Sequence, residues 1–190
     1  MAASPDPSSV FTTALRILAL GFCLCVPTPA LAESGDLLAT DIATGLMPIA
    51  ALGTAWLKDD RLGAYEWMRD TGLETVINSG LRVAFNQTSL GKRPNGGAYG
   101  FPSGHAGFVF SQAGFLQERY GWHYGAPALA VATTVGYVRV REHKHHWRDI
   151  IAGGAVAYGV SLLTVTPDDA TELAPVVGPE WLGLRFKRSF

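Results

Sequence analysis

Three residues in the second half of the chain have the types and spacing of a nucleophilic catalytic centre. Arg139 is followed by five residues and then His145, and three further residues separate His145 from Asp149. A carboxylate four positions after a histidine, at the start of a helix, can accept a hydrogen bond from one imidazole nitrogen and leave the other free as a nucleophile. The spacing therefore predicts a His145–Asp149 pair beside the guanidinium group of Arg139.

The histidine-rich stretch that carries this pair has two other interpretations. Zinc could be held by His143, His145 and Asp149 together with His105. The four Arg and Lys side chains between residues 139 and 148 favour a phosphate over a dication, however. A solvated run of charges is the simplest alternative, and it suffices for His143 and His146.

A second cluster, PSGH at 102–105, stands where a helix is expected to begin. In a purely structural interpretation, the Ser103 side chain only caps the first turn of that helix. The same N–H groups, with the helix dipole behind them, also form an anion site, and Gly104 would let a ligand approach the backbone closely. Arg93 and Arg139 would add bidentate contacts to a phosphate group.

Helices separated by turns with Gly, Pro or Asp must position these clusters. The economical fold is an all-α antiparallel bundle of about five to six helices, with helices expected near 37–57, 64–85, 104–119, 126–141 and 147–164. In such a bundle the start of the third helix, the end of the fourth and the start of the fifth lie at one pole, which the loop at 86–102 also reaches. The polar clusters then converge on one end of an apolar bundle.

The first two helices differ in their distribution of charge. The segment 37–57 carries one charged residue, Asp41, and fits either a core helix or a transmembrane span. The segment 64–85 has an acidic face and an apolar face, formed by Glu66, Asp70 and Glu74 and by Leu73, Val76, Ile77 and Leu81 respectively. We interpret this second segment as a half-solvated helix, a pattern that fits lipid poorly.

The N-terminus predicts export. Arg16, an apolar run and the sequence PTPALA precede Glu33, which is the order of a secretory signal with cleavage after Ala32. An uncleaved anchor is the alternative. Both cysteines, Cys23 and Cys25, lie inside the apolar run, so cleavage would leave the exported domain without a thiol, a disulfide or a cysteine metal site.

The composition describes one folded domain. The chain has 190 residues, of which 48% are hydrophobic and 16% charged, and its net charge is −1, so neither a disordered chain nor a nucleic-acid partner is expected. We divide it into a signal peptide at 1–32, a helical domain at 33–166 and a tail at 167–190. The tail could form a short hairpin or cover the bundle.

The sequences GKRP, FPSGH and R-x5-H-x3-D occur in this order. Together they resemble the three signature motifs of the phosphatidic acid phosphatase type 2 and vanadium haloperoxidase superfamily, over roughly residues 40–166. The second motif is complete, and in the third Val138 stands where the family usually has serine.

The first motif departs from the family pattern. Arg93 and Pro94 match, but Asn86 occupies the position where the family has lysine. A longer loop in this chain would place Arg82 in the role of that lysine, and Lys92 is the other candidate. The resemblance therefore implies a further cation and leaves open which side chain supplies it.

The resemblance implies a metal-independent acid phosphatase without a cofactor, acting on phosphate monoesters or lipid (pyro)phosphates. In that scheme His145 attacks phosphorus to form a phosphohistidine, Asp149 orients the ring, and His105 protonates the leaving oxygen and then activates water. The phosphate oxygens would be held by Arg93, Arg139, Ser103, Gly104 and either Arg82 or Lys92. The alternatives are a vanadate-dependent haloperoxidase and a non-catalytic phosphate-binding protein of the envelope.

Cleavage after Ala32 would deliver the domain to the bacterial periplasm. There it would be either a soluble bundle or a bundle associated with the inner membrane, with its site facing the periplasm. The expected partner is a phosphorylated substrate, lipid or soluble.

Overall fold

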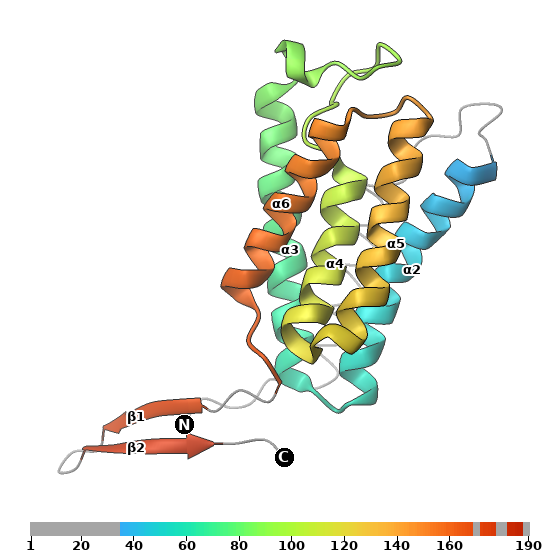
Figure 1. The fold of residues 1–190 in the computed structure, drawn as a ribbon. Coiled ribbons are helices and arrows are strands. Elements are labelled where there is room, and N and C mark those ends of the chain that lie inside the picture. Colours follow the sequence, from blue (N-terminus) through green and yellow to red (C-terminus); the bar gives the residue numbers. More distant parts are fainter. Residues whose placement is uncertain (1–34, 169–171, 178–181, 188–190) are drawn as a thin grey trace.

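The computed structural model describes residues 35–168, 172–177 and 182–187, so the predicted signal peptide lies outside the described residues. An antiparallel helical bundle forms the body of the molecule, which confirms the predicted all-α fold (Figure 1). Its helices are α2 (Gly35–Leu57), α3 (Arg61–Phe85), α4 (Gly104–Tyr120), α5 (Trp122–Arg141) and α6 (Trp147–Thr164), and the short 3-10 helix η1 (Ser89–Gly91) follows α3.

Local capping signals set where the helices begin. The Asp60 side chain accepts a hydrogen bond from the Gly63 backbone N–H at 2.8 Å and starts α3. Gly121, with φ 79°, is the single residue between α4 and α5, because glycine adopts this conformation without steric cost. Helix α5 therefore begins at Trp122, earlier than the expected 126, and Pro127 lies inside it.

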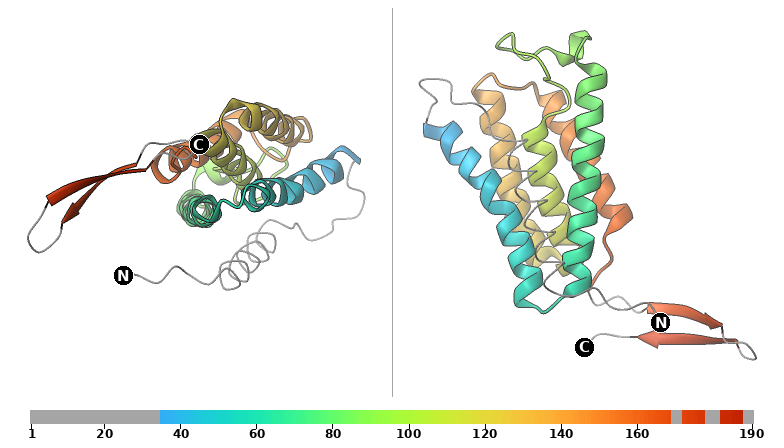
Figure 2. Two further views of the ribbon diagram at one scale, coloured as in Figure 1. Left: turned by 90° about the horizontal axis from the view of Figure 1, so that it is seen from below. Right: turned by 180° about the vertical axis from the view of Figure 1, so that it is seen from behind.

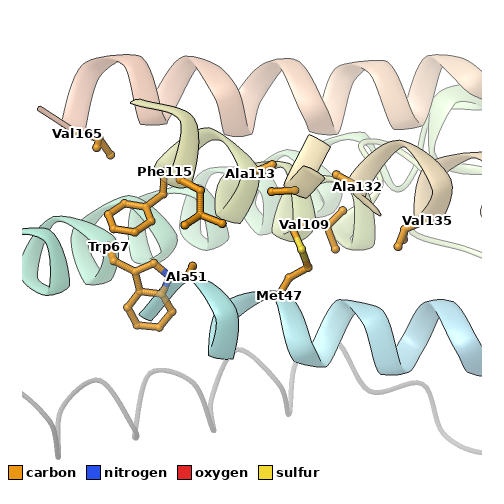
Figure 3. Packing of buried hydrophobic residues seen from close by; sticks show 11 residues of the cluster. Met47, Ala51, Trp67, Val109, Ala113, Phe115, Ala132, Val135 and Val165 are labelled. Atoms are coloured by element: carbon orange, nitrogen blue, oxygen red, sulfur yellow. The ribbon is translucent and has the colours of Figure 1, made fainter. Parts of the chain in front are cut away.

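Helix α4 is the centre of the bundle and contacts each of the other four helices (Figure 2). Its neighbours approach closely because Ala51, Ala113 and Ala132 are fully buried between them (Figure 3). The larger side chains of Trp67 and Phe115 fill the space toward one end and are also fully buried.

The orientation of α3 is the reverse of the one predicted. The carboxylates of Glu66, Asp70 and Glu74 are buried, at 4%, 0% and 1% exposure, whereas Leu73 and Val76 are 43% and 70% exposed. The half-solvated interpretation was wrong, since the acidic face is turned into the bundle and the apolar face outward. Periodicity shows that a helix has two faces but does not say which face meets the protein.

Polar partners on α4 and α6 decide that orientation. The two carboxylate oxygens of Asp70 accept hydrogen bonds from Ser111 at 2.8 Å and from Thr164 at 3.1 Å. Glu74 accepts from the Asn78 amide at 2.7 Å. Buried carboxylates require such partners. Those of Asp70 come from residues distant in the sequence, whereas Asn78 lies one turn from Glu74 on α3 itself.

The tail forms two antiparallel strands, β1 (Glu172–Val177) and β2 (Leu182–Lys187), with Glu172 opposite Lys187. Of the two expected options for this segment, the structure has the hairpin. It lies beyond the end of α6, away from the loop at 86–102 (Figure 1).

Candidate active site

The segments that carry the motifs meet at the pole where α4 begins (Figure 1). The end of α3, the loop at 86–103, the end of α5 and the loop at 142–146 all reach this pole, as expected from antiparallel helices. The start of α2, which carries none of the three motifs, reaches it as well. We call this end of the bundle the catalytic pole and the opposite end the distal pole.

His145 is the one buried residue of the stretch 143–146, at 2% exposure. Its Nδ1 lies 2.9 Å from the Gly100 carbonyl oxygen. Because a carbonyl only accepts hydrogen bonds, Nδ1 carries the proton when the ring is neutral, and Nε2 keeps its lone pair. The loop is fixed by the Arg139 carbonyl, which accepts from the backbone N–H groups of Lys144 at 2.9 Å and of His145 at 3.2 Å.

Asp149 lies beside the same ring and is fully buried in the first turn of α6. Its Oδ2 is 3.7 Å from His145 Nδ1 and accepts a hydrogen bond from the His146 backbone N–H at 2.8 Å. The structure thus brings the predicted pair together. The nearer acceptor for His145 is Gly100, which sequence reasoning missed because a backbone carbonyl has no residue-type signal.

Burial lowers the pKa of His145 below its usual 6.5, an effect that Asp149 partly offsets and the positive charge of Arg93 strengthens. The imidazole is therefore uncharged at neutral pH. Burial and the neighbouring Arg82 also lower the pKa of Arg93, although a guanidinium remains protonated in proteins. Two cations and an uncharged imidazole thus share one small region.

The start of α4 is joined directly to the start of α6. Ser103 is fully buried, its hydroxyl caps α4 by accepting from the Ala106 N–H at 3.4 Å, and its own N–H donates to the Asp149 carbonyl at 2.9 Å. A Cβ on Gly153 would come within 2.6 Å of the Ser103 carbonyl oxygen, so a larger residue at 153 would push the two helices apart. This contact holds the N-terminus of α4 against His145 and Asp149.

The two candidates for the missing lysine lie in different surroundings. A Cβ on Gly104 would lie 3.0 Å from Arg82 Nη1, so the Arg82 guanidinium sits against the N-terminus of α4. Lys92 is exposed in the loop after η1. Arg93, the next residue, is held by a turn in which its N–H donates to the Gly97 carbonyl at 2.8 Å.

Arg139 and His105 complete the cluster and share a contact with Asp41 from α2. Arg139 is 4% exposed in the last turn of α5, and its guanidinium pairs with Asp41 Oδ1. His105 Nε2 lies 3.2 Å from the same oxygen. Asp41 was not predicted at the site, although it stands out as the one charge in the apolar segment 37–57.

The zinc grouping considered from the sequence is not assembled. His143 and His146 are exposed, whereas His145 is buried. Within residues 35–168, 172–177 and 182–187, no three His, Cys, Asp or Glu side chains form a group that could hold a metal ion.

Comparison with known proteins identifies the family. A family model described as the PAP2 superfamily matches residues 65–169, more than half of the chain. The chain belongs to the PAP2 superfamily. The resemblance read from the three motifs is confirmed, and the matched range includes Arg82, Lys92 and the motif residues from Arg93 to Asp149 but not Asp41.

Two named relatives share part of this sequence. A lipid A 4'-phosphatase of Helicobacter pylori is 38% identical over 90 residues, which are 47% of this chain and 43% of the relative. Phospholipid phosphatase 2 of Mus musculus is 36% identical over 77 residues, and the match covers 34% of this chain and 28% of the relative. Each match spans less than half the length of the relative.

The PAP2 fold is also seen in a solved structure. The crystal structure of LpxE from Aquifex aeolicus superposes with a TM-score of 0.53 and 20% sequence identity, covering 85% of this chain and 87% of that one. At this identity the likeness shows a shared fold.

Proposed function

We propose that this protein is a metal-independent phosphatase that transfers the phosphoryl group of a phosphate monoester or lipid (pyro)phosphate to His145. One observation carries the proposal: a buried, uncharged imidazole with Nδ1 bonded to Gly100 shares one pole with the guanidinium groups of Arg82, Arg93 and Arg139. Catalysis of phosphoryl transfer depends mainly on a positioned nucleophile and on positive charge around the phosphate oxygens.

In the proposed reaction, the Nε2 lone pair of His145 forms a bond to phosphorus as the ester P–O bond breaks. His105 gives a proton to the departing oxygen, which leaves as an alcohol. His105 then takes a proton from water, the resulting hydroxide displaces the imidazole from phosphorus, and inorganic phosphate leaves. Asp149, 3.7 Å from Nδ1, stabilises the positive charge that the phosphorylated ring carries.

The decisive test compares two histidines of one stretch. His145→Ala should abolish hydrolysis of an aryl phosphate while the protein stays folded, and the exposed His143→Ala should leave the rate unchanged. Mass spectrometry of a rapidly quenched reaction should find the phosphoryl group on the peptide that contains His145. Retained turnover in His145→Ala would exclude this residue as the nucleophile.

Metal independence is tested separately. Activity should survive EDTA, and orthovanadate should inhibit, because it offers a five-coordinate mimic of the transferring phosphoryl group. Loss of activity in EDTA that zinc restores would contradict this part of the proposal.

We further propose that the bundle lies in a membrane. Within the described residues, one helix, α2, is long and apolar enough to span a bilayer by length and composition alone. The stronger support is the reversed orientation of α3, which buries carboxylates and turns Val76 outward at 70% exposure. That arrangement suits a surrounding of lipid rather than water. The exposed apolar surface of α3 continues onto the neighbouring helices. Its further members include Ile42, Leu46 and Ile49 on α2 and Ile151, Leu162 and Leu163 on α6.

Exposed aromatic side chains mark both ends of this apolar surface. Those at the catalytic pole are Tyr99, Tyr137 and Trp147, and those at the distal pole are Trp56, Tyr65, Trp122 and Tyr124. Trp and Tyr gather where a bilayer meets water. Helix α5 has 20 residues, which is a length of about 30 Å and close to the thickness of the hydrocarbon core, about 30 Å.

The exposed cation on α3, Arg69, is compatible with a bilayer around the bundle. The Arg69 guanidinium reaches the Thr164 carbonyl at the end of α6 and lies 5.9 Å from the centre of the Tyr65 ring, near the distal aromatic residues. A long cationic side chain that extends toward the interface in this way is tolerated in a membrane protein.

Membrane embedding is measured by extraction and by fluorescence. The protein should remain in the membrane fraction after an alkaline carbonate wash and dissolve in detergent. Lipids brominated near the headgroup should quench the exposed Trp56, Trp122 and Trp147 strongly. Release into the wash would contradict the proposal.

We also propose on which side of the membrane the site lies. Residues 1–32 are the export signal, and the catalytic pole faces the periplasm. In a background lacking Cys23 and Cys25, a cysteine replacing the exposed Lys92 should react with a membrane-impermeant maleimide in intact cells. A cysteine replacing Arg61, exposed at the distal pole, should not react. The opposite labelling pattern would place the site in the cytoplasm.

Lipid phosphate is the substrate class that we propose for this site. The names of both relatives refer to lipid substrates, and a site at one end of a lipid-facing bundle would lie at the level of phosphate headgroups. Hydrolysis of a long-chain lipid phosphate should exceed that of the matching soluble ester in kcat/KM. Equal values would favour a soluble substrate.

A further inference from the structure

Asp41 is a charged residue in an otherwise apolar segment, and neither the three motifs nor the matched range 65–169 includes it. It lies in the second turn of α2, which packs against α4 and α5. This packing brings its side chain, 20% exposed, to the catalytic pole.

One carboxylate oxygen of Asp41 contacts two proposed catalytic groups. Oδ1 is 3.2 Å from His105 Nε2 and also pairs with the guanidinium of Arg139. The partners come from α4 and α5, and their side chains are 16% and 4% exposed. A single shielded oxygen thus connects the proton donor with a phosphate-binding cation.

We infer that Asp41 is a positioning residue, which orients His105 for proton transfer and holds Arg139 for phosphate binding. This inference rests on the proposed phosphatase function. If Oδ1 accepts the Nε2–H of His105, then Nδ1 is the nitrogen that exchanges the proton with the leaving oxygen and with water. The carboxylate also favours the imidazolium form, which the first chemical step requires.

The charges around His105 support this role. Arg139, Arg82 and Arg93 gather at the same pole and disfavour a positive charge on the His105 imidazole, as does any charge on His145. Of the carboxylates, Asp149 is engaged with the His145 side of the site, and Asp41 lies against His105. Without Asp41, His105 should therefore lose its proton at a lower pH.

A competing explanation is that Asp41 occupies the place of the substrate phosphate and must be displaced by it. The two explanations predict opposite effects of removing the charge. A positioning carboxylate supports turnover, so its loss lowers kcat. A competing anion weakens binding, so its loss lowers KM and strengthens inhibition by inorganic phosphate.

The experiment uses the full chain in detergent and compares Asp41→Asn with Asp36→Asn. Asp36 is a matched control, since it lies one turn earlier on α2 and pairs with Arg141 on the surface at 62% side-chain exposure. Asp41→Asn should lower kcat for an alkyl phosphate by about 10- to 100-fold, by analogy with the loss of a carboxylate that orients a metal-bound histidine. Asp36→Asn should match the unaltered protein.

Two further readouts separate positioning from a purely structural role. The loss should be smaller for p-nitrophenyl phosphate, because its leaving group needs little protonation. The alkaline limb of the kcat profile should move to lower pH in Asp41→Asn and stay unchanged in Asp36→Asn. Thermal unfolding monitors the fold. If Asn at 41 prevents folding, Asp41→Glu keeps the charge and should keep the wild-type alkaline limb with a lower kcat.

Equal losses for both esters with an unmoved alkaline limb would overturn the inference, as would a displaced limb in Asp41→Glu. A lower KM with stronger phosphate inhibition would also overturn it, in favour of a competing anion. If the unaltered protein hydrolyses neither ester, the proposed function fails and the inference with it. If it hydrolyses both and Asp41→Asn behaves as Asp36→Asn does, only the inference about Asp41 fails.

Discussion

Both poles of the bundle contain buried arginine, but the two poles differ in how many carboxylates surround it. At the distal pole, the Arg119 guanidinium donates to both oxygens of Asp60 at 2.7 Å and to the Thr166 carbonyl at 2.7 Å. Glu66 and Asp168 lie 3.5 and 3.4 Å away. One cation there is surrounded by three carboxylates, all supplied by the protein.

At the catalytic pole the cations are not outnumbered by carboxylates in this way. Arg82, Arg93 and Arg139 share the region with Asp41 and Asp149, and Glu74 lies within electrostatic reach of Arg82. Positive charge in a shielded region needs a counter-charge, and here an anionic substrate can supply it. This difference in the surroundings of buried arginine is the reason that we propose the phosphate site at the catalytic pole and not at the distal pole.

The largest expected effects come from removing one arginine at each pole. Arg139→Ala should lower kcat/KM by about 10²- to 10³-fold, as for loss of a group that stabilises transition-state charge, with a small change in melting temperature. Arg119→Ala should destabilise the protein by about 3–5 kcal/mol, because it leaves buried carboxylates unpaired, while the folded fraction keeps its activity. Phosphatase assays and thermal unfolding of both variants check this. Equal losses of activity would remove the distinction between the poles.

An intermediate effect is expected within the catalytic pole. Arg82 lies against Gly104 at the start of α4, whereas Lys92 is exposed. Arg82→Ala should reduce kcat/KM by about 10- to 100-fold, since a charge-assisted hydrogen bond contributes about 1.5–3 kcal/mol, and Lys92→Ala should be nearly silent. Steady-state kinetics with one phosphate ester measures both. The reverse order would make Lys92 the equivalent of the motif lysine.

The smallest effects concern pH. Because burial lowers the pKa of His145 below 6.5, protonation should inactivate the nucleophile only as pH falls below 6.5. At the distal pole, burial opposes the shift, but hydrogen bonds from Arg119, the Gly63 N–H and Tyr120 hold the pKa of Asp60 below 3.8. Its contribution to stability is present above 3.8 and is lost as pH falls through the lower folded-state value.

The protein should therefore lose activity in mild acid while it remains folded. The acid limb of kcat/KM against pH, set beside unfolding followed by circular dichroism, tests this order. Unfolding that coincides with the loss of activity would show that the two poles do not titrate independently.

Local sequence determined much of this fold and site. Five helices were predicted from the apolar periodicity and from the Gly, Pro and Asp residues between the apolar segments. Their predicted ends agree with the structure to within a few residues, apart from the start of α5. The spacing of Arg139, His145 and Asp149 brought all three to one pole, because helix length and antiparallel order fix where each helix ends. These features depend on residues close together in the chain.

Tertiary structure decided the rest. Asp70 faces inward because Ser111, 41 positions later, gives it a partner. Gly100 accepts from His145 across 45 positions, and Asp41 meets His105 only because α2 packs on α4. The sequence alone specified which residue types were present and how they recur along each helix. The buried hydrogen-bond partners, which lie far apart in the chain and meet only in the folded bundle, determined which face turns inward and which carboxylate meets which cation.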